Sequence, residues 1–126
     1  MREVRSSGAP SPVGPYSQGI LYGNFIFTSG QIGIDPESGK LVEGFREQVL
    51  RALNNLKAVV EAAGGSRCSI VKVVVYLTEL EKFKEFNEIY EEFFKECPVK
   101  PARVTVGVKE LPLGAQVEVE CIAVRG

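Results

Sequence analysis

The sequence predicts an α+β domain in which two helices cover one face of a mixed β-sheet. The chain has 126 residues, 44% of them hydrophobic and 25% charged, which is typical of one soluble domain with its own core. β-prone segments and two amphipathic helical patterns alternate in the order ββ-α-β-α-ββ. No composition shift, repeat or low-complexity stretch divides the chain, so we expect residues 1–126 to form a single domain.

The first elements are expected to be a loop and a β-hairpin. Residues 1–15 are polar and rich in Gly, Pro and Ser, which favours a loop. Residues 20–22 and 25–29 are β-prone, and the turn dipeptide Gly23-Asn24 lies between them.

Two helices are predicted by apolar residues at every third or fourth position. The first covers residues 45–63 and ends at Gly64-Gly65. The second begins near residues 78–81, where Thr and Glu have capping-box spacing, and ends at Pro98. The apolar positions are Phe45, Val49, Leu53, Leu56, Val60 and Ala63 in the first helix, and Phe83, Phe86, Tyr90, Phe93 and Cys97 in the second.

Three further segments complete the predicted sheet. Residues 71–77 form a β-branched run between the helices, and residues 104–108 and 117–124 close the chain. We expect the two closing strands to pair with their apolar sets together under the helices, because a slip of one residue would expose one set.

That register places four polar residues on the sheet face away from the helices: Arg103, Thr105, Glu118 and Glu120. Such a face is either solvated or an interface that contains a polar site. Arg103 is either a surface arginine paired with a glutamate or a bidentate clamp for a carboxylate, which suits guanidinium geometry. Glu118 beside Glu120 would have a raised pKa if partly buried, as a general base near neutral pH requires, and would be inert on a solvated strand.

Composition excludes several classes of function. The chain has no histidine, which removes Ser-His-Asp and Cys-His catalysis and the commonest zinc ligand. Its 15 basic and 16 acidic residues give a net charge of −1, which draws it to neither nucleic acid nor anionic membrane. The longest apolar run, residues 73–77, is far too short to span a membrane.

The cysteines indicate neither a metal site nor a disulfide framework. Cys68, Cys97 and Cys121 are odd in number and widely spaced. Residues 1–15 have no apolar signal core. We therefore expect a reduced, cytoplasmic protein.

Three shorter patterns contain candidate ligand-binding residues. Tyr16 lies in a Gly-Pro-Tyr-Ser-Gln segment, where it either packs on the core or borders a pocket. Ser29 and Gly30 end a strand, and a ligand can approach a glycine N–H closely, although a plain turn also explains them. Asn87 is mildly unfavourable in mid-helix, which indicates either a polar contact or an exposed position.

In this order and spacing the patterns resemble the Rid family of reactive-intermediate (enamine/imine) deaminases, also called the YjgF family. The resemblance covers nearly the whole chain. It is carried by Gly14-Pro15-Tyr16-Ser17-Gln18, Ser29-Gly30-Gln31, Asn54-Asn55-Leu56, Ala63-Gly64, Asn87-Glu88-Ile89-Tyr90, Pro101-Ala102-Arg103, Leu111-Pro112 and Glu118-Val119-Glu120.

The resemblance implies a chorismate-mutase-like fold and a homotrimer with ligand sites between subunits. It implies that Arg103 binds the substrate carboxylate with help from the backbone of Gly30, and that Glu118 activates water. The residues implied to line the pocket are Tyr16, Ser29 and Asn87. The implied activity is that of a 2-iminobutanoate/2-iminopropanoate deaminase, which hydrolyses 2-aminoacrylate and related 2-imino acids to 2-keto acids and ammonia.

No metal or organic cofactor is implied, and the implied partners are a small imino or keto acid and other copies of the chain. Some members carry cysteine where this chain has Thr105, so thiol reactivity is not expected at that position. The main alternative is a non-catalytic trimeric binding module for 2-keto or 2-imino carboxylates. Glu118 separates the two, because an anion binder gains nothing from a carboxylate beside its ligand. A third possibility is an RNA-acting protein, which the charge balance disfavours.

Overall fold

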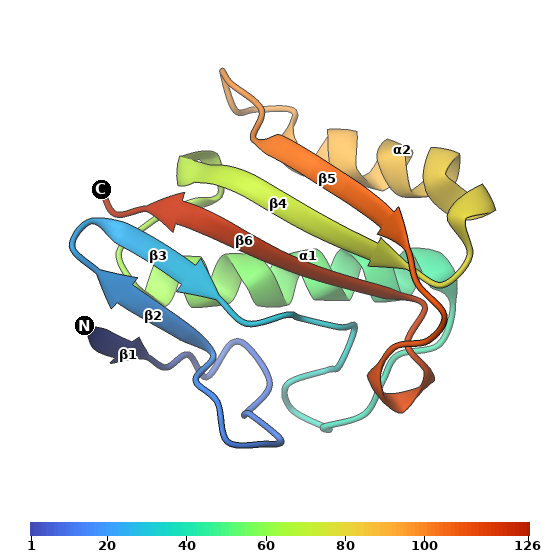
Figure 1. The fold of residues 1–126 in the computed structure, drawn as a ribbon, viewed down its shortest axis with the longest axis horizontal. Coiled ribbons are helices and arrows are strands. Elements are labelled where there is room, and N and C mark those ends of the chain that lie inside the picture. Colours follow the sequence, from blue (N-terminus) through green and yellow to red (C-terminus); the bar gives the residue numbers. More distant parts are fainter.

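The computed structural model describes all 126 residues as one sheet with two helices on one of its faces (Figure 1). The strand order is β1-β2-β3-β6-β4-β5, with every neighbouring pair antiparallel except the parallel pair β4–β5. The predicted α+β architecture is therefore confirmed. The elements are β1 (Arg2–Val4), β2 (Gly19–Tyr22), β3 (Phe25–Thr28), α1 (Phe45–Ala62), β4 (Ile70–Leu77), α2 (Phe83–Phe94), β5 (Ala102–Gly107) and β6 (Val117–Val124).

The core lies between the helices and the sheet. Burying aliphatic side chains of this size stabilises a fold by about 1.5–3 kcal/mol each, and the period of the sequence decides which residues are buried. Residues with no exposed surface include Val49, Leu53, Leu56 and Val60 of α1, Val73, Val75 and Leu77 of β4, and Val117 and Val119 of β6. Neither helix is both long and apolar enough to cross a membrane.

Two local features differ from the sequence-based expectation. Residues 2–4 form β1, which pairs with β2, although only Val4 of the three is buried. A three-residue strand with one buried side chain is too short for an alternating pattern to reveal it. The expected capping box before α2 does not form, because Thr78 contacts the backbone of Gln116 and a 3-10 turn at Leu80–Lys82 precedes the helix.

The expected pairing of the two closing strands is wrong. β4 lies between β5 and β6, and β5 is an edge strand that pairs only with β4. Arg103 lies opposite Val73 and Thr105 opposite Val75, so both polar side chains share the helix-facing side of the sheet.

Glu118 and Glu120 instead lie opposite Tyr76 and Val74, on the face that no helix covers. Arg103 and Glu118 are therefore on opposite faces of the sheet within one chain. The apolar residues of β5 that were expected under the helices, Val104 and Val106, are 43% and 38% exposed.

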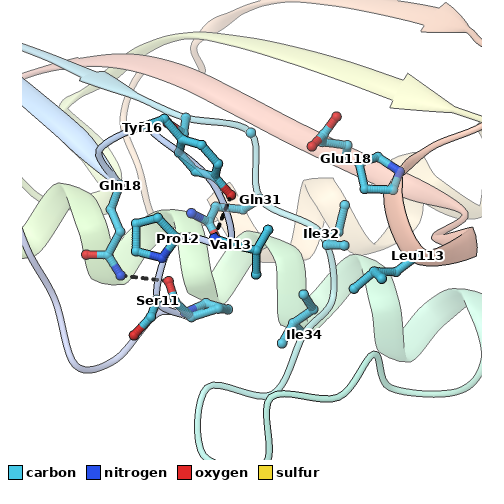
Figure 2. Close-up of a pocket in the computed structure, with 14 residues that line it drawn as sticks. Ser11, Pro12, Val13, Tyr16, Gln18, Gln31, Ile32, Ile34, Leu113 and Glu118 are labelled. Atoms are coloured by element: carbon cyan, nitrogen blue, oxygen red, sulfur yellow. Dashed lines mark hydrogen bonds between the residues drawn. The ribbon is translucent and has the colours of Figure 1, made fainter.

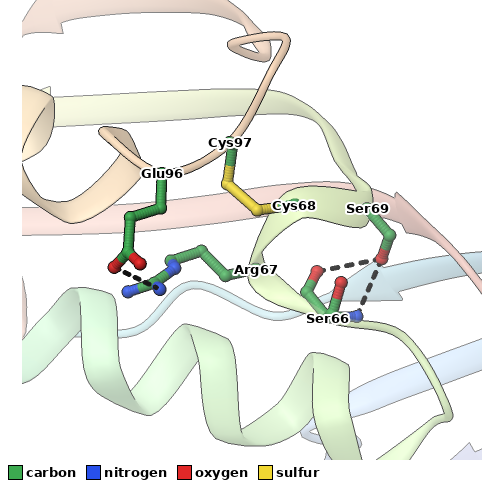
Figure 3. The surroundings of a disulfide bond; sticks show 6 residues. All are labelled: Ser66, Arg67, Cys68, Ser69, Glu96 and Cys97. Atoms are coloured by element: carbon green, nitrogen blue, oxygen red, sulfur yellow. Dashed lines mark hydrogen bonds and ion pairs between the residues drawn. A yellow bond between two sulfur atoms is a disulfide. The ribbon is translucent and has the colours of Figure 1, made fainter.

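Cys68 and Cys97 form a disulfide, which contradicts the expectation of a fully reduced protein (Figure 3). Their Cα atoms are 5.2 Å apart, although 29 residues separate them in sequence. The bond joins the 3-10 turn Arg67–Ser69 to the segment after α2, beside an ion pair between Arg67 and Glu96. Counting and spacing cysteines could not show this pair, because only the packing of α2 brings them together. Cys121 is free and buried.

Loss of this disulfide is expected to lower the free energy of unfolding by about 3–4 kcal/mol, because the bond closes a loop of intermediate length in the unfolded chain. The measurement is urea unfolding of the protein with and without reductant, and of a Cys68→Ser/Cys97→Ser variant, at one fixed protomer concentration. The reduced protein and the variant should share a lower midpoint. Equal midpoints for oxidised and reduced protein would contradict a stabilising role.

Candidate functional site

A pocket of about 400 Å³ opens where the N-terminal loop, the segment after β3 and the start of β6 meet (Figure 2). Four of the candidate residues border it: Tyr16, Ser29, Gly30 and Glu118. We call these four residues the glutamate half-site. Its remaining walls are mainly apolar or uncharged, and no lysine or arginine lines it.

Gly30 and Glu118 are in close contact because the segment after β3 is bound to β6. The backbone N–H of Gln31 donates to the Val119 carbonyl at 2.7 Å, and the Val119 N–H donates back at 3.0 Å. A Cβ atom at Gly30 would lie 2.7 Å from Oε2 of Glu118, so a larger residue here would displace the carboxylate from its present position.

Glu118 has an unpaired carboxylate with a raised pKa. Partial burial of the side chain is the larger cause that raises this pKa above its usual range. The negative charge of Glu120 raises it further. Glu120 itself accepts a hydrogen bond of 2.7 Å from the Tyr76 hydroxyl, whereas Glu118 has neither an ion-pair nor a hydrogen-bond partner in the chain. The Glu118 carboxylate is therefore free to accept a proton or a hydrogen bond from a bound molecule.

Gln18 holds the N-terminal wall of the pocket in place. Its buried amide donates to the carbonyls of Ala9 and Pro10, at 3.3 and 2.8 Å, and bonds both ways with the backbone of Ser6. The Ser29 hydroxyl donates to the Ser17 carbonyl, which ties the end of β3 to the same loop.

Asn55 holds the opposite wall. It is fully buried on α1, and its side-chain amide donates to the carbonyls of Ile32 and Ile34, at 3.1 and 2.9 Å. Arg51 donates to its side-chain oxygen at 3.0 Å. Neither Gln18 nor Asn55 is among the site residues expected from the sequence. For Asn55 the sequence held a signal, because it is a polar residue on the apolar face of a helix. A buried amide must satisfy its hydrogen bonds, so such a residue indicates a structural contact.

Arg103 and Asn87 lie elsewhere, Arg103 on the edge strand β5 and Asn87 on α2. We call Arg103, Asn87, Tyr90 and Thr105 the arginine half-site. Cζ of Arg103 lies 4.7 Å from the centroid of the Tyr90 ring. The expectation that Arg103 shares a sheet face with Glu118 is wrong, because β5 presents Arg103 toward α2.

The two elements of the arginine half-site, α2 and β5, carry unpaired polar atoms. Three buried side-chain polar atoms in the chain have no hydrogen-bond partner: Oδ1 of Asn87, the hydroxyl of Tyr90 and Oγ1 of Thr105. Burial raises the pKa of Tyr90 to about 12, so its hydroxyl stays protonated. Buried polar groups without partners are rare and costly, so their presence on α2 and on the strand that carries Arg103 favours a polar partner for these elements.

Comparison with known proteins places the chain in a family. Residues 6–125 match the family model described as Endoribonuclease L-PSP. The chain belongs to the Rid (YjgF/RutC) family. It is 61% identical over 125 residues to a RutC family protein of Aquifex aeolicus, covering 99% of this chain and all of that protein.

Two further members of the Rid family carry more specific descriptions. A human protein named 2-iminobutanoate/2-iminopropanoate deaminase is 40% identical over 126 residues, covering 99% of this chain and 90% of that protein. The crystal structure of Escherichia coli TdcF with bound serine matches with a TM-score of 0.96 and 39% identity, over the full length of both chains. The family resemblance expected from the sequence is thus confirmed.

Proposed function

We propose that the protein is a homotrimeric deaminase that hydrolyses 2-imino acids, such as 2-iminopropanoate and its enamine 2-aminoacrylate, to 2-keto acids and ammonia. The observation that supports this best is Glu118, an unpaired carboxylate with a raised pKa that faces the pocket. The named deaminase relatives support the same reaction class.

The chemistry needs only the groups that the two half-sites provide. Arg103 binds the substrate carboxylate, and Glu118 accepts a proton from a water molecule as its oxygen attacks the carbon of the protonated imine. The resulting carbinolamine takes that proton on nitrogen and expels ammonia, while its hydroxyl proton passes to the Glu118 carboxylate, which leaves the keto acid. The imine is already electrophilic, so positioning of water and one proton transfer contribute most of the acceleration.

We further propose that each active site combines the arginine half-site of one subunit with the glutamate half-site of the next. Within one chain the two half-sites lie on opposite faces of the sheet. The face that carries Glu118 has no helix over it, and four apolar side chains of β3 and β5 are 38–52% exposed: Phe25, Phe27, Val104 and Val106. An uncovered apolar face and an unpaired edge strand favour cyclic association, which buries both without open-ended growth.

A direct assay tests the activity. The protein should release ammonia and pyruvate from 2-aminoacrylate generated in situ, faster than the spontaneous hydrolysis. If pyruvate binds to the protein but hydrolysis is not accelerated, the non-catalytic binding module is the correct alternative. An RNA-acting role finds no support in the pocket, because no basic side chain lines it to hold phosphates.

Mixing two inactive variants tests the site between subunits. Arg103→Ala and Glu118→Gln homotrimers should both be nearly inactive. Random reassembly should restore about a quarter of the parental activity, because a site is intact only when each of its two contributing subunits carries the required residue. No recovery from verified mixed trimers would contradict a shared site, and monomers in light scattering would contradict the trimer.

The rate should fall at low pH with a midpoint above the usual carboxyl range. The pKa of Glu118 is raised, so the carboxylate that accepts the proton from water becomes protonated at a higher pH than an ordinary glutamate. Glu120→Gln removes the neighbouring charge and should move the acid limb of kcat/KM to lower pH. Burial, the larger cause, remains, so the limb should stay above the usual range. An unchanged limb in Glu120→Gln would contradict the contribution of the Glu120 charge, and an unchanged limb in the residual activity of Glu118→Gln would show that another group controls it.

A cytoplasmic location is also part of the proposal, because short-lived imines must be hydrolysed close to where they form. Disulfides are uncommon in reducing compartments, so the Cys68–Cys97 disulfide is a reason to test this location. Fractionation of expressing cells, with thiol labelling under acid quench, would report the location and the redox state together.

A further inference from the structure

The guanidinium of Arg103 is held by aromatic rings and by no charged group. None of the ion pairs in the chain includes it. Its Cζ lies 4.7, 5.4 and 5.7 Å from the ring centroids of Tyr90, Phe83 and Phe86. We call these three rings the ring platform.

The platform comes from one face of α2. Residues 83, 86 and 90 are three and four positions apart, which places their side chains together on a helix. Phe86 is fully buried and Tyr90 is 6% exposed, so both are fixed by the core, whereas Phe83 at the start of α2 is 40% exposed. The rings of Phe86 and Tyr90 also contact each other, with centroids 5.5 Å apart.

A cation on ring faces keeps its hydrogen-bonding edge available. The ring quadrupole attracts the guanidinium through space, while its N–H groups point outward in its plane. A glutamate partner would instead occupy that edge. Restricting a flexible arginine before binding also reduces the conformational entropy that is lost when a ligand orders it.

We propose that the ring platform fixes the orientation of Arg103 so that its N–H edge meets the carboxylate of a 2-imino or 2-keto acid, and that Phe83 is a positioning residue. The inference depends on the proposed function for the identity of the ligand. It assigns a binding role to an exposed aromatic side chain that touches the substrate only through Arg103.

Phe83→Leu tests the proposal, since it removes a ring without emptying the core. The probe is pyruvate, titrated calorimetrically into the full-length trimer. We expect affinity to fall about 3- to 10-fold, as the loss of one partly exposed cation–π contact predicts. Phe83→Tyr keeps a ring face and should restore binding. In the deaminase assay KM should rise with kcat unchanged, because the carboxylate is held equally in ground and transition states.

A double-variant cycle separates positioning from general damage. Phe83→Leu should not lower kcat/KM further when Arg103 is already lysine, because the ring acts through the guanidinium. The proposal is overturned by unchanged pyruvate affinity in Phe83→Leu, by equal losses in Phe83→Tyr, by additive losses in the cycle, or by dissociation of the Phe83→Leu trimer.

Failure of the deaminase proposal gives a different result. A protein that binds pyruvate in a manner dependent on Phe83, yet hydrolyses no imine, would contradict the activity and support the platform. If the Phe83→Leu variant deaminates imines with unchanged kcat and KM, the result supports the activity and contradicts the platform. Absence of any pyruvate binding by the parent protein would overturn the platform proposal as well.

Discussion

Glu118→Gln is expected to lower kcat for imine hydrolysis by about 10²- to 10⁴-fold, the usual contribution of a positioned general base. Glutamine keeps the shape of the side chain and a hydrogen bond to water but cannot accept a proton. The variant should still bind pyruvate, and more tightly than the parent, because a negative charge beside the anionic ligand is removed. Hydrolysis rates and calorimetric binding on the same preparation measure both effects.

Glu120→Gln is the matched control for this substitution. Glu120 lies two residues along the same strand face but bonds to Tyr76 and does not line the pocket. At a pH above the acid limb its kcat should equal that of the parent. If Glu118→Gln hydrolyses the imine as fast as the parent does, Glu118 is no general base and the binding-module alternative gains.

Arg103→Lys is expected to lower kcat/KM by roughly 30- to 1000-fold, or about 2–4 kcal/mol of transition-state binding. Lysine keeps the charge but loses the two parallel N–H groups that hold a carboxylate, and it cannot stack flat on the aromatic rings of α2. Pyruvate binding should weaken in parallel, because the same contact serves substrate and product.

Arg46→Lys is the control for the charge-preserving change. Arg46 lies on the surface of α1, where it pairs with Glu85 and Glu88 at 3.6 Å, and exposed pairs of this kind contribute little. This variant should be fully active. Normal pyruvate binding by Arg103→Lys would show that the carboxylate clamp lies elsewhere in the molecule.

Much of the half-site around Glu118 could be anticipated from the sequence. Ser29 and Gly30 directly follow β3, one residue past the predicted strand end at most, and the raised pKa of Glu118 follows from partial burial and from a second carboxylate two residues away. These features are local, since a strand period of two and a glycine at a strand end depend on near neighbours in sequence. The space that Gly30 leaves for the Glu118 carboxylate was visible only in the fold.

The alternation of apolar and polar residues does not predict the order of the strands in the sheet. Alternation shows which residues of a strand share a face, but not which face is buried when the strand lies at an edge. The succession β4-α2-β5 is a strand–helix–strand unit, and such units join parallel neighbours. That topology makes β4 the partner of β5 and turns Arg103 toward the rings of α2.

The sequence by itself determined the two helices, the hairpin, the strands after it and the family, because periodicity, turn residues and ordered motifs are properties of neighbouring residues. The tertiary structure alone decided the Cys68–Cys97 disulfide and the separation of Arg103 from Glu118. Both depend on how α2, which connects β4 to β5 in sequence, packs on the sheet. Packing joins residues that are distant in the chain, and their spacing in sequence carries no record of which pairs will meet.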